Sequence, residues 1–151
     1  MKNIIKLPVM LVAIFMLLMF ALDLTKWGYQ VVVPGYIFVS AGIFLLGIII
    51  IAIGGYYFRK AKTTVNPMTP EKSTELVTKG IYNYSRNPMY IGFLTWLIAW
   101  AVFLGNLINL LFLPIFIVLV NRLYIIPEEK ALEELFKQEF SEYKNRVGRW
   151  L

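Results

Sequence analysis

The sequence predicts an all-α integral membrane protein with about four transmembrane helices and a C-terminal amphipathic interfacial helix. Three observations predict this fold class. Apolar residues make up 59% of the 151 residues, well above the usual content of soluble domains. They form four long blocks rather than the spaced pattern of a core surrounded by water. The basic residues fall between the blocks in an order that fits a single membrane orientation.

The first two apolar blocks, residues 7–24 and 31–58, are expected to form a two-helix membrane scaffold that comprises residues 1–58. The basic start and first apolar run also resemble a signal peptide. No small-residue cleavage site follows, so we interpret residues 7–24 as a retained span. Trp27 and Tyr29 come next, where an aromatic belt at the interface is expected.

Residues 59–151 are expected to form the cofactor-binding half of the same structural domain. This half begins with a polar loop, residues 63–79, that contains two prolines. Two further apolar blocks, residues 89–104 and 107–126, then predict a helical hairpin whose tight turn is Gly105–Asn106.

The amphipathic helix is expected to follow Pro127, which we predict ends the last span. Residues 128–147 repeat apolar side chains at spacings of three and four, with charges mostly between them. Such a helix lies along the membrane surface or packs beneath the bundle.

With four spans, every Lys and Arg except Lys26 falls on one side of the membrane. The positive-inside rule makes that side cytoplasmic, so both termini and the candidate site are predicted to face the cytoplasm. The net charge of +6 is thereby explained without a nucleic-acid partner.

Absent residues and motifs restrict the chemistry. The chain has no Cys and no His, which excludes disulfides, thiolate or imidazole catalysis and the usual zinc ligands. It has no glycine-rich nucleotide motif of the Rossmann or P-loop type. No metal is expected, and any catalysis must depend on carboxylates, Arg, Lys, Tyr, Asn, backbone groups or a bound cofactor.

Polar and aromatic side chains gather where the third apolar block begins. Asn87 and Pro88 are good residues for starting a helix, and Arg86 can extend to the interface, so a structural role explains part of this pattern. The clustering also favours a binding site, because a helix N-terminus offers free N–H groups to an anion. The clustered residues are Tyr82, Tyr84, Arg86, Asn87 and Tyr90.

A second polar group surrounds the end of the fourth block. Asn121 and Arg122 lie within the apolar run, where an Arg is costly unless it faces a cavity, a partner or the nearby interface. Glu128 and Glu129 follow Pro127, where acidic residues also simply complement the helix dipole. Arg122 and both glutamates lie within two helical turns, so we expect them to line one pocket.

Two separated motifs resemble one family. They are G-I-Y-N-Y-S-R-N-P-M-Y-I-G and N-R-x(5)-E-E-x-x-L-x-x-x-F-x-x-E-F-x-x-Y-x-x-R-V-x-R-W. Together with the preceding T-T-V-N-P loop, they resemble the isoprenylcysteine carboxyl methyltransferase and phospholipid methyltransferase superfamily. The resemblance covers roughly residues 59 to 151.

The resemblance implies an integral membrane methyltransferase that uses S-adenosylmethionine and releases S-adenosylhomocysteine. It implies cofactor binding by Gly80, Tyr82, Arg86, Asn87, Pro88, Tyr90, Glu128 and Glu129, and it places Arg122 near the reacting centre. Arg122, Asn121 and Glu129 are therefore the candidate catalytic residues. Many members have His where this chain has Asn87, which retains hydrogen bonding but cannot transfer a proton near neutral pH.

The implied acceptor is a lipid-like molecule that enters from the bilayer and carries a carboxylate or an amine. Two other functions remain open at this point. One is a sterol-type membrane reductase that uses reduced nicotinamide nucleotide (NADPH), because such reductases resemble the family in their C-terminal half. The other is a small four-span transporter or scaffold without enzymatic activity.

Overall fold

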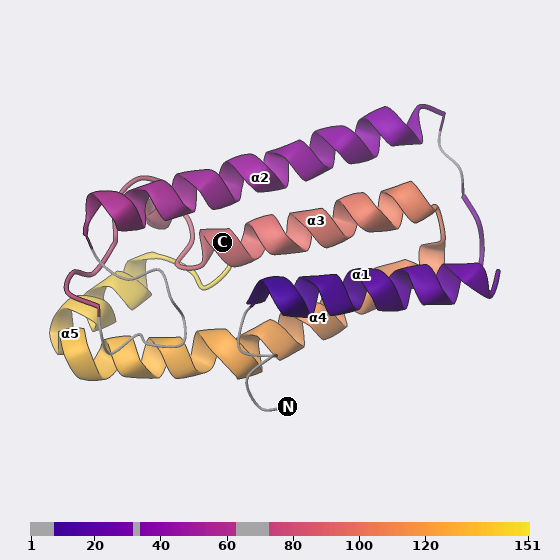
Figure 1. Ribbon diagram of the computed structural model, residues 1–151. Coiled ribbons are helices and arrows are strands. Elements are labelled where there is room, and N and C mark those ends of the chain that lie inside the picture. Colours follow the sequence, from indigo (N-terminus) through magenta and orange to yellow (C-terminus); the bar gives the residue numbers. More distant parts are fainter. Residues whose placement is uncertain (1–7, 32–33, 63–72) are drawn as a thin grey trace.

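The computed structural model describes residues 8–31, 34–62 and 73–151, and these form a helical protein. Figure 1 shows α2, α3 and the pair of α1 and α4 side by side, with α3 between the others. The α-helices are α1 (Pro8–Leu24), α2 (Tyr36–Lys60), α3 (Pro88–Leu104), α4 (Phe112–Val120) and α5 (Ile126–Arg146). The short helices are the 3-10 helices η2 (Gly80–Asn83) and η3 (Leu107–Leu111) and the π-helix η4 (Asn121–Ile125).

The hydrophobic core lies between α1, α3 and α4. Met19 from α1, Leu97 from α3 and Phe116 from α4 are completely buried in it. Phe15 contacts Phe116 edge to face at a ring-centroid distance of 5.4 Å. The first helix thus supplies part of the core of the described fold.

Glycines allow α2 and α3 to approach closely. A Cβ atom on Gly92 would lie 2.9 Å from the carbonyl oxygen of Gly47, which no real side chain tolerates. Trp96 fills the space beside this contact and stacks on Phe44, with ring centroids 5.1 Å apart. Gly47 and Gly92 thus have a packing role at this helix contact.

The predicted hairpin turn joins α3 to the next helical segment. Gly105 has φ 69°, a conformation that favours glycine, and the Asn106 side chain accepts a hydrogen bond from the Ile108 N–H. The Gly105 carbonyl also accepts a 2.6 Å hydrogen bond from the Val31 N–H. This turn is consequently fixed to the connection between α1 and α2.

Among the described residues, two helical segments are long and apolar enough to cross a membrane, namely α2 and the continuous stretch Leu107–Arg146. Helices α1 and α3 are also apolar, and each has 17 residues. Large apolar side chains on α2 point outward, with Phe38 83% exposed. These features support a membrane location, while the number of spans remains a prediction.

The prediction that a separate helix follows Pro127 is wrong, because helical backbone continues from η4 into α5. Pro127 has no N–H to donate to the Leu123 carbonyl, and its ring needs space there. The preceding turn is a π-helix, Asn121–Ile125, whose wider hydrogen-bonding pattern accommodates the proline.

The C-terminal helix is not continuous either. Lys137 has φ 42° and ψ −111°, so α5 consists of two helices joined at a sharp bend. Figure 1 shows the second half turning back toward the start of α3. Phe140 and Tyr143 from this half bury themselves against Leu76 in a second, smaller core. The bend therefore places the end of the chain beside the candidate site.

Candidate active site

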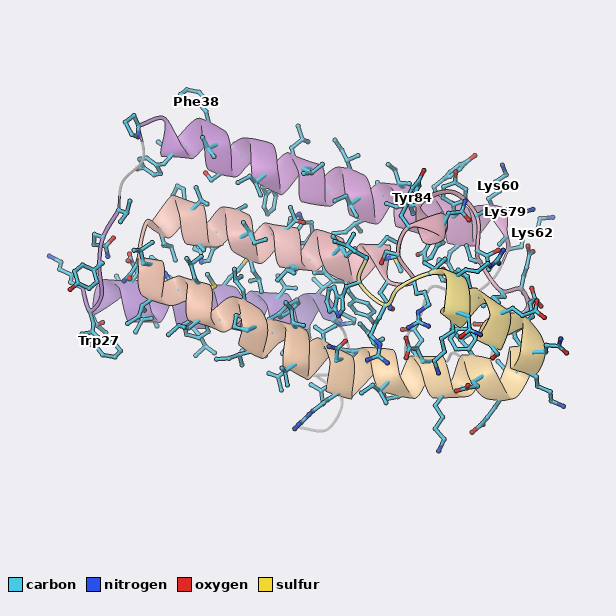
Figure 2. The ribbon with its side chains drawn as sticks, turned by 180° about the vertical axis from the view of Figure 1, so that it is seen from behind. Trp27, Phe38, Lys60, Lys62, Lys79 and Tyr84 are labelled. Atoms are coloured by element: carbon cyan, nitrogen blue, oxygen red, sulfur yellow. The ribbon has the colours of Figure 1, made fainter. Side chains whose placement is uncertain are left out.

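A pocket lies at one end of the helical bundle. Figure 2 shows Trp27 and Phe38 at the other end, and Lys60, Lys62, Lys79 and Tyr84 at the pocket end. The walls of the pocket come from the end of α2, from residues 73–87 and from α5. The lining residues are Phe58, Ser73, Glu75, Leu76, Val77, Tyr82, Arg86, Asn87, Glu128, Glu129, Leu132, Phe140 and Tyr143. The sequence predicts two walls, Tyr82–Tyr90 and Arg122–Glu129. The pocket brings together Tyr82, Arg86, Asn87, Glu128 and Glu129 from them, while its lining does not include Tyr84, Tyr90 or Arg122.

Glu129 is held by two arginines. Arg86 Nη2 lies 2.9 Å from Glu129 Oε1, while Arg149 Nε and Nη2 donate to Oε1 and Oε2 at 3.1 and 2.6 Å. Glu129 is only 8% exposed, so this carboxylate is buried and fully paired. The hydrogen bond to Glu129 raises the pKa of Arg149 above its ordinary value. Glu129 therefore acts here as the centre of a charged cluster.

Arg86 keeps two unused donors. Its side chain is 9% exposed, and its Nε and Nη1 atoms have no hydrogen-bond partner within the described part of the chain. A buried guanidinium edge of this kind is costly unless an acceptor binds it. The free edge of Arg86 is consequently a candidate anion-binding group.

Glu128 has a different environment from its neighbour. Its Oε2 accepts a 3.4 Å hydrogen bond from the Tyr90 hydroxyl, and the Tyr90 ring stacks on Tyr124 at 6.1 Å. Glu128 lies beyond Ile126, where the apolar part of the helix ends. Burial raises the pKa of Glu128 to about 7, with Glu129 adding to the shift and Tyr90 opposing it. Glu128 can thus hold or release a proton near neutral pH.

Tyr82 and Gly80 are fixed by packing. Tyr82 is 3% exposed, its hydroxyl has no partner among the described residues, and burial raises the pKa of that hydroxyl. Gly80 has φ 65°, and a Cβ atom there would overlap the ring of Tyr57. The structure gives Gly80 a conformational and packing role, while Tyr82 offers a free hydroxyl to the pocket.

Asn87 and Pro88 start α3 as predicted, but the Asn87 side chain does not cap the helix. Its Nδ2 instead donates a 2.9 Å hydrogen bond to the carbonyl of Arg149. The Arg86 N–H donates to the Gly148 carbonyl at 3.0 Å. The end of the chain is therefore attached along this segment.

Arg122 is placed differently from the expectation. It is exposed, it does not line the pocket, and it forms no ion pair with a described residue. In an α-helix, residues 122 and 129 would lie on nearly the same face. The π-helix adds a residue to the intervening turn and rotates Arg122 away. Asn121 accepts a 3.1 Å hydrogen bond from Trp150 Nε1.

The sequence interpretation did not assign Arg149, Tyr143 or Phe140 to the site. All three lie in the second motif, whose later part ends in R-V-x-R-W. The recurrence of Arg and aromatic residues after an amphipathic helix was the available signal. Without the bend at Lys137, nothing indicated that these residues return to the pocket.

Comparison with known proteins identifies the family. The phospholipid methyltransferase family model matches residues 27–139, well over half of the chain. The chain belongs to the phospholipid methyltransferase family. The family match includes the paired glutamates and the segment from Gly80 to Tyr90, and it ends before Phe140 and Arg149.

Several relatives support this family assignment. Protein-S-isoprenylcysteine O-methyltransferase of Saccharomyces cerevisiae is 41% identical over 81 residues, which are 52% of this chain and 33% of the yeast protein. Protein-S-isoprenylcysteine O-methyltransferase B of Arabidopsis thaliana is 39% identical over 80 residues, or 51% of this chain and 39% of that protein. An uncharacterized protein of Haemophilus influenzae is 43% identical over 63 residues, its whole length and 42% of this chain.

The matched region spans only about a third of the named methyltransferases. Membership of the phospholipid methyltransferase family nevertheless supports a methyltransferase over the reductase and the scaffold considered from the sequence.

Proposed function

We propose that this protein is an integral membrane methyltransferase that uses S-adenosylmethionine to methylate a lipophilic acceptor on a carboxylate or an amine. The observation that carries the proposal is the buried, unpaired edge of Arg86 in a pocket that also contains Glu128. Family membership supplies the reaction class. The isoprenylcysteine named in the relatives is the acceptor to test first.

The donor set of the pocket fits this cofactor. Arg86 Nε or Nη1, which have no partner among the described residues, would donate a charge-assisted hydrogen bond to the carboxylate of its amino-acid part. Glu128 and the Tyr82 hydroxyl would bind its ammonium or ribose hydroxyl groups. The apolar lining, which includes Phe58 and Phe140, suits an aromatic base.

The pocket must widen to hold such a molecule. Its enclosed space is about 40 Å³, room for no more than a few water molecules. We therefore propose that the walls formed by residues 73–87 and by α5 move apart when the cofactor enters.

The cofactor supplies a methyl group on a positively charged sulfur, which is already activated for transfer. The protein's contribution is then mainly positioning and electrostatic stabilisation. Arg122 would orient an acceptor carboxylate from outside the cofactor pocket, since it is exposed and unpaired among the described residues. For an amine acceptor, Glu128 would take up the proton, because its pKa is close to neutral pH. Asn121 would act indirectly by holding Trp150.

We further propose that the pocket and both termini face the cytoplasm, as the distribution of basic residues indicates. The soluble cofactor would then enter from the cytoplasm, and the lipophilic acceptor would arrive through the bilayer. This arrangement is consistent with the position of the pocket at one end of the bundle, next to exposed Lys60 and Lys79 (Figure 2).

The proposal is tested by calorimetric titration of the purified protein in detergent. We expect S-adenosylhomocysteine to bind the wild type, and NADPH not to bind. Arg86→Gln is expected to abolish measurable binding, because it removes the anion-binding edge. Arg59→Gln, which changes an exposed arginine outside the pocket lining, serves as the matched control. Binding of NADPH alone, or of neither compound, would overturn the proposal.

A further inference from the structure

We propose that Arg149 is a positioning residue of the cofactor pocket. Together with its neighbours Gly148 and Trp150 it forms a segment that we call the C-terminal clasp. The clasp fixes Glu129, and Glu129 in turn fixes Arg86 with its free edge ready for the carboxylate of the ligand. This inference rests on the proposed function, and it concerns residues beyond residue 139, where the family match ends.

The backbone of the clasp is attached to the segment before α3. The Gly148 carbonyl accepts a hydrogen bond from the Arg86 N–H at 3.0 Å. The Arg149 carbonyl accepts from Asn87 Nδ2 at 2.9 Å and from Ser85 Oγ at 3.4 Å. Ser85 and Asn87 are both buried, so these bonds are shielded from water and hold the clasp in one place.

The side chain of Arg149 completes the environment of Glu129. It donates to both carboxylate oxygens, at 3.1 and 2.6 Å, while Arg86 Nη2 approaches Oε1 at 2.9 Å. A carboxylate held by a guanidinium fork has a defined orientation. Glu129 can therefore present Oε1 to Arg86 in only one direction, which leaves Nε and Nη1 of Arg86 without a protein partner.

Trp150 anchors the other end of the clasp. Its Nε1 donates to Asn121 Oδ1 at 3.1 Å, in the π-helix. The half-buried Trp150 ring also packs against the main hydrophobic core. The clasp thus connects the start of α3 with the π-helix and the first turn of α5, which follows the π-helix directly and lies far from α3 in sequence.

This arrangement explains why an amide side chain can serve at position 87. A side-chain amide at this position donates to a carbonyl of the clasp at any pH, because it does not titrate. We infer that Asn87 attaches the clasp and takes no part in proton transfer.

The first test measures the affinity for S-adenosylhomocysteine by calorimetry in Arg149→Ala, Arg149→Lys and the control Arg146→Ala. Arg146 is exposed and does not line the pocket. We expect Arg149→Ala to weaken binding roughly 10- to 100-fold, as displaced positioning groups typically do. We expect Arg149→Lys to restore only part of it, because Lys lacks the guanidinium fork. Arg146→Ala should bind like the wild type.

A double-mutant cycle shows whether Arg149 acts through Glu129. If it does, Arg149→Lys causes no further loss of affinity in a Glu129→Gln background. Additive losses would contradict the proposed route from Arg149 through Glu129 to Arg86. If Arg149→Lys only lowered the stability of the protein, the folded variant would bind S-adenosylhomocysteine with the wild-type affinity. That result would contradict the positioning role.

The second test requires no ligand, so it separates the clasp from the proposed function. Hydrogen exchange at the Arg86 amide reports the bond to Gly148. We expect slow exchange in the wild type and in Arg146→Ala, and faster exchange in Arg149→Lys. Unchanged exchange together with unchanged affinity would overturn the clasp. A wild type that binds no S-adenosylhomocysteine would overturn the proposed function, and exchange would still decide whether the clasp exists.

Discussion

The Tyr143 hydroxyl donates a buried 2.7 Å hydrogen bond to the backbone carbonyl of Tyr82, across 61 positions of sequence. This bond joins the second half of α5 to η2 and closes the pocket between them. It exists only because α5 bends at Lys137 and returns toward the bundle. The pocket is consequently formed by tertiary contacts, not by the local motif around Arg86 alone.

Tyr143→Phe tests the contribution of this bond. We expect the variant to lose about 1 kcal/mol, because the buried Tyr82 carbonyl is left without its donor. For a chain of this size the midpoint of thermal unfolding would fall by about 2–4 °C. A thermal-shift measurement in detergent checks this fall in the unfolding midpoint. Tyr84→Phe is the control, since Tyr84 is 76% exposed. Equal midpoints for the two variants would contradict the expectation.

Gly80→Ala is expected to destabilise the protein strongly, for two reasons. The residue has φ 65°, and the added methyl group would overlap the ring of Tyr57. Gly42→Ala is the matched control, because it lies in α2 with open space around its Cβ position and Ala favours a helix. The yield of folded protein and the unfolding temperature distinguish them. A stable Gly80→Ala protein would show that this segment packs differently.

The raised pKa of Glu128 predicts that the stability of the folded protein depends on pH. Its pKa is raised from 4.5 to about 7 in the folded chain, so the folded state holds the proton more tightly than the unfolded state. The stabilisation of the folded state by protonated Glu128 is therefore greatest below pH 4.5, and it decreases as the pH rises to about 7. In Glu128→Gln this decrease should be absent. Unfolding temperatures of both proteins between about pH 5 and pH 8 provide the measurement, and parallel curves would contradict it.

Arg122→Ala is expected to separate cofactor binding from methyl transfer. Arg122 does not line the pocket, so the affinity for S-adenosylhomocysteine should stay within about twofold, as for surface substitutions. Methyl transfer to a carboxylate acceptor should fall at least about tenfold if Arg122 orients that acceptor. Calorimetry and a transfer assay with an isoprenylcysteine analogue give the two values. Weakened binding of the cofactor product would place Arg122 in the pocket after all.

Features set by local chemistry could be predicted from the sequence. Gly105–Asn106 forms the turn because glycine accepts its positive φ and Asn bonds the following N–H. Pro88 starts α3 for an equally local reason, whereas the Asn87 side chain does not cap the helix. The apolar blocks predicted helices close to the observed bounds.

Features set by tertiary contacts could not be predicted in this way. Lysine has no preference for the backbone conformation of Lys137, so no local residue pattern indicated the bend. Arg149 resembles any other basic residue of a polar tail until the bend brings it to Glu129. The expectation that Arg122 and both glutamates line one pocket did not include the π-helix, which changes the direction of Arg122 relative to Glu129.

The π-helix Asn121–Ile125 has a consequence for the evolution and engineering of this chain. Each residue of an α-helix advances the backbone by about 100° around the axis. If residues 121–125 formed regular α-helix without a change of length, Phe116 and Glu129 would turn by about that angle relative to each other. Buried Phe116 would leave the core or Glu129 would leave its arginines. The π-helix thus sets the rotational phase between the membrane half and the pocket half.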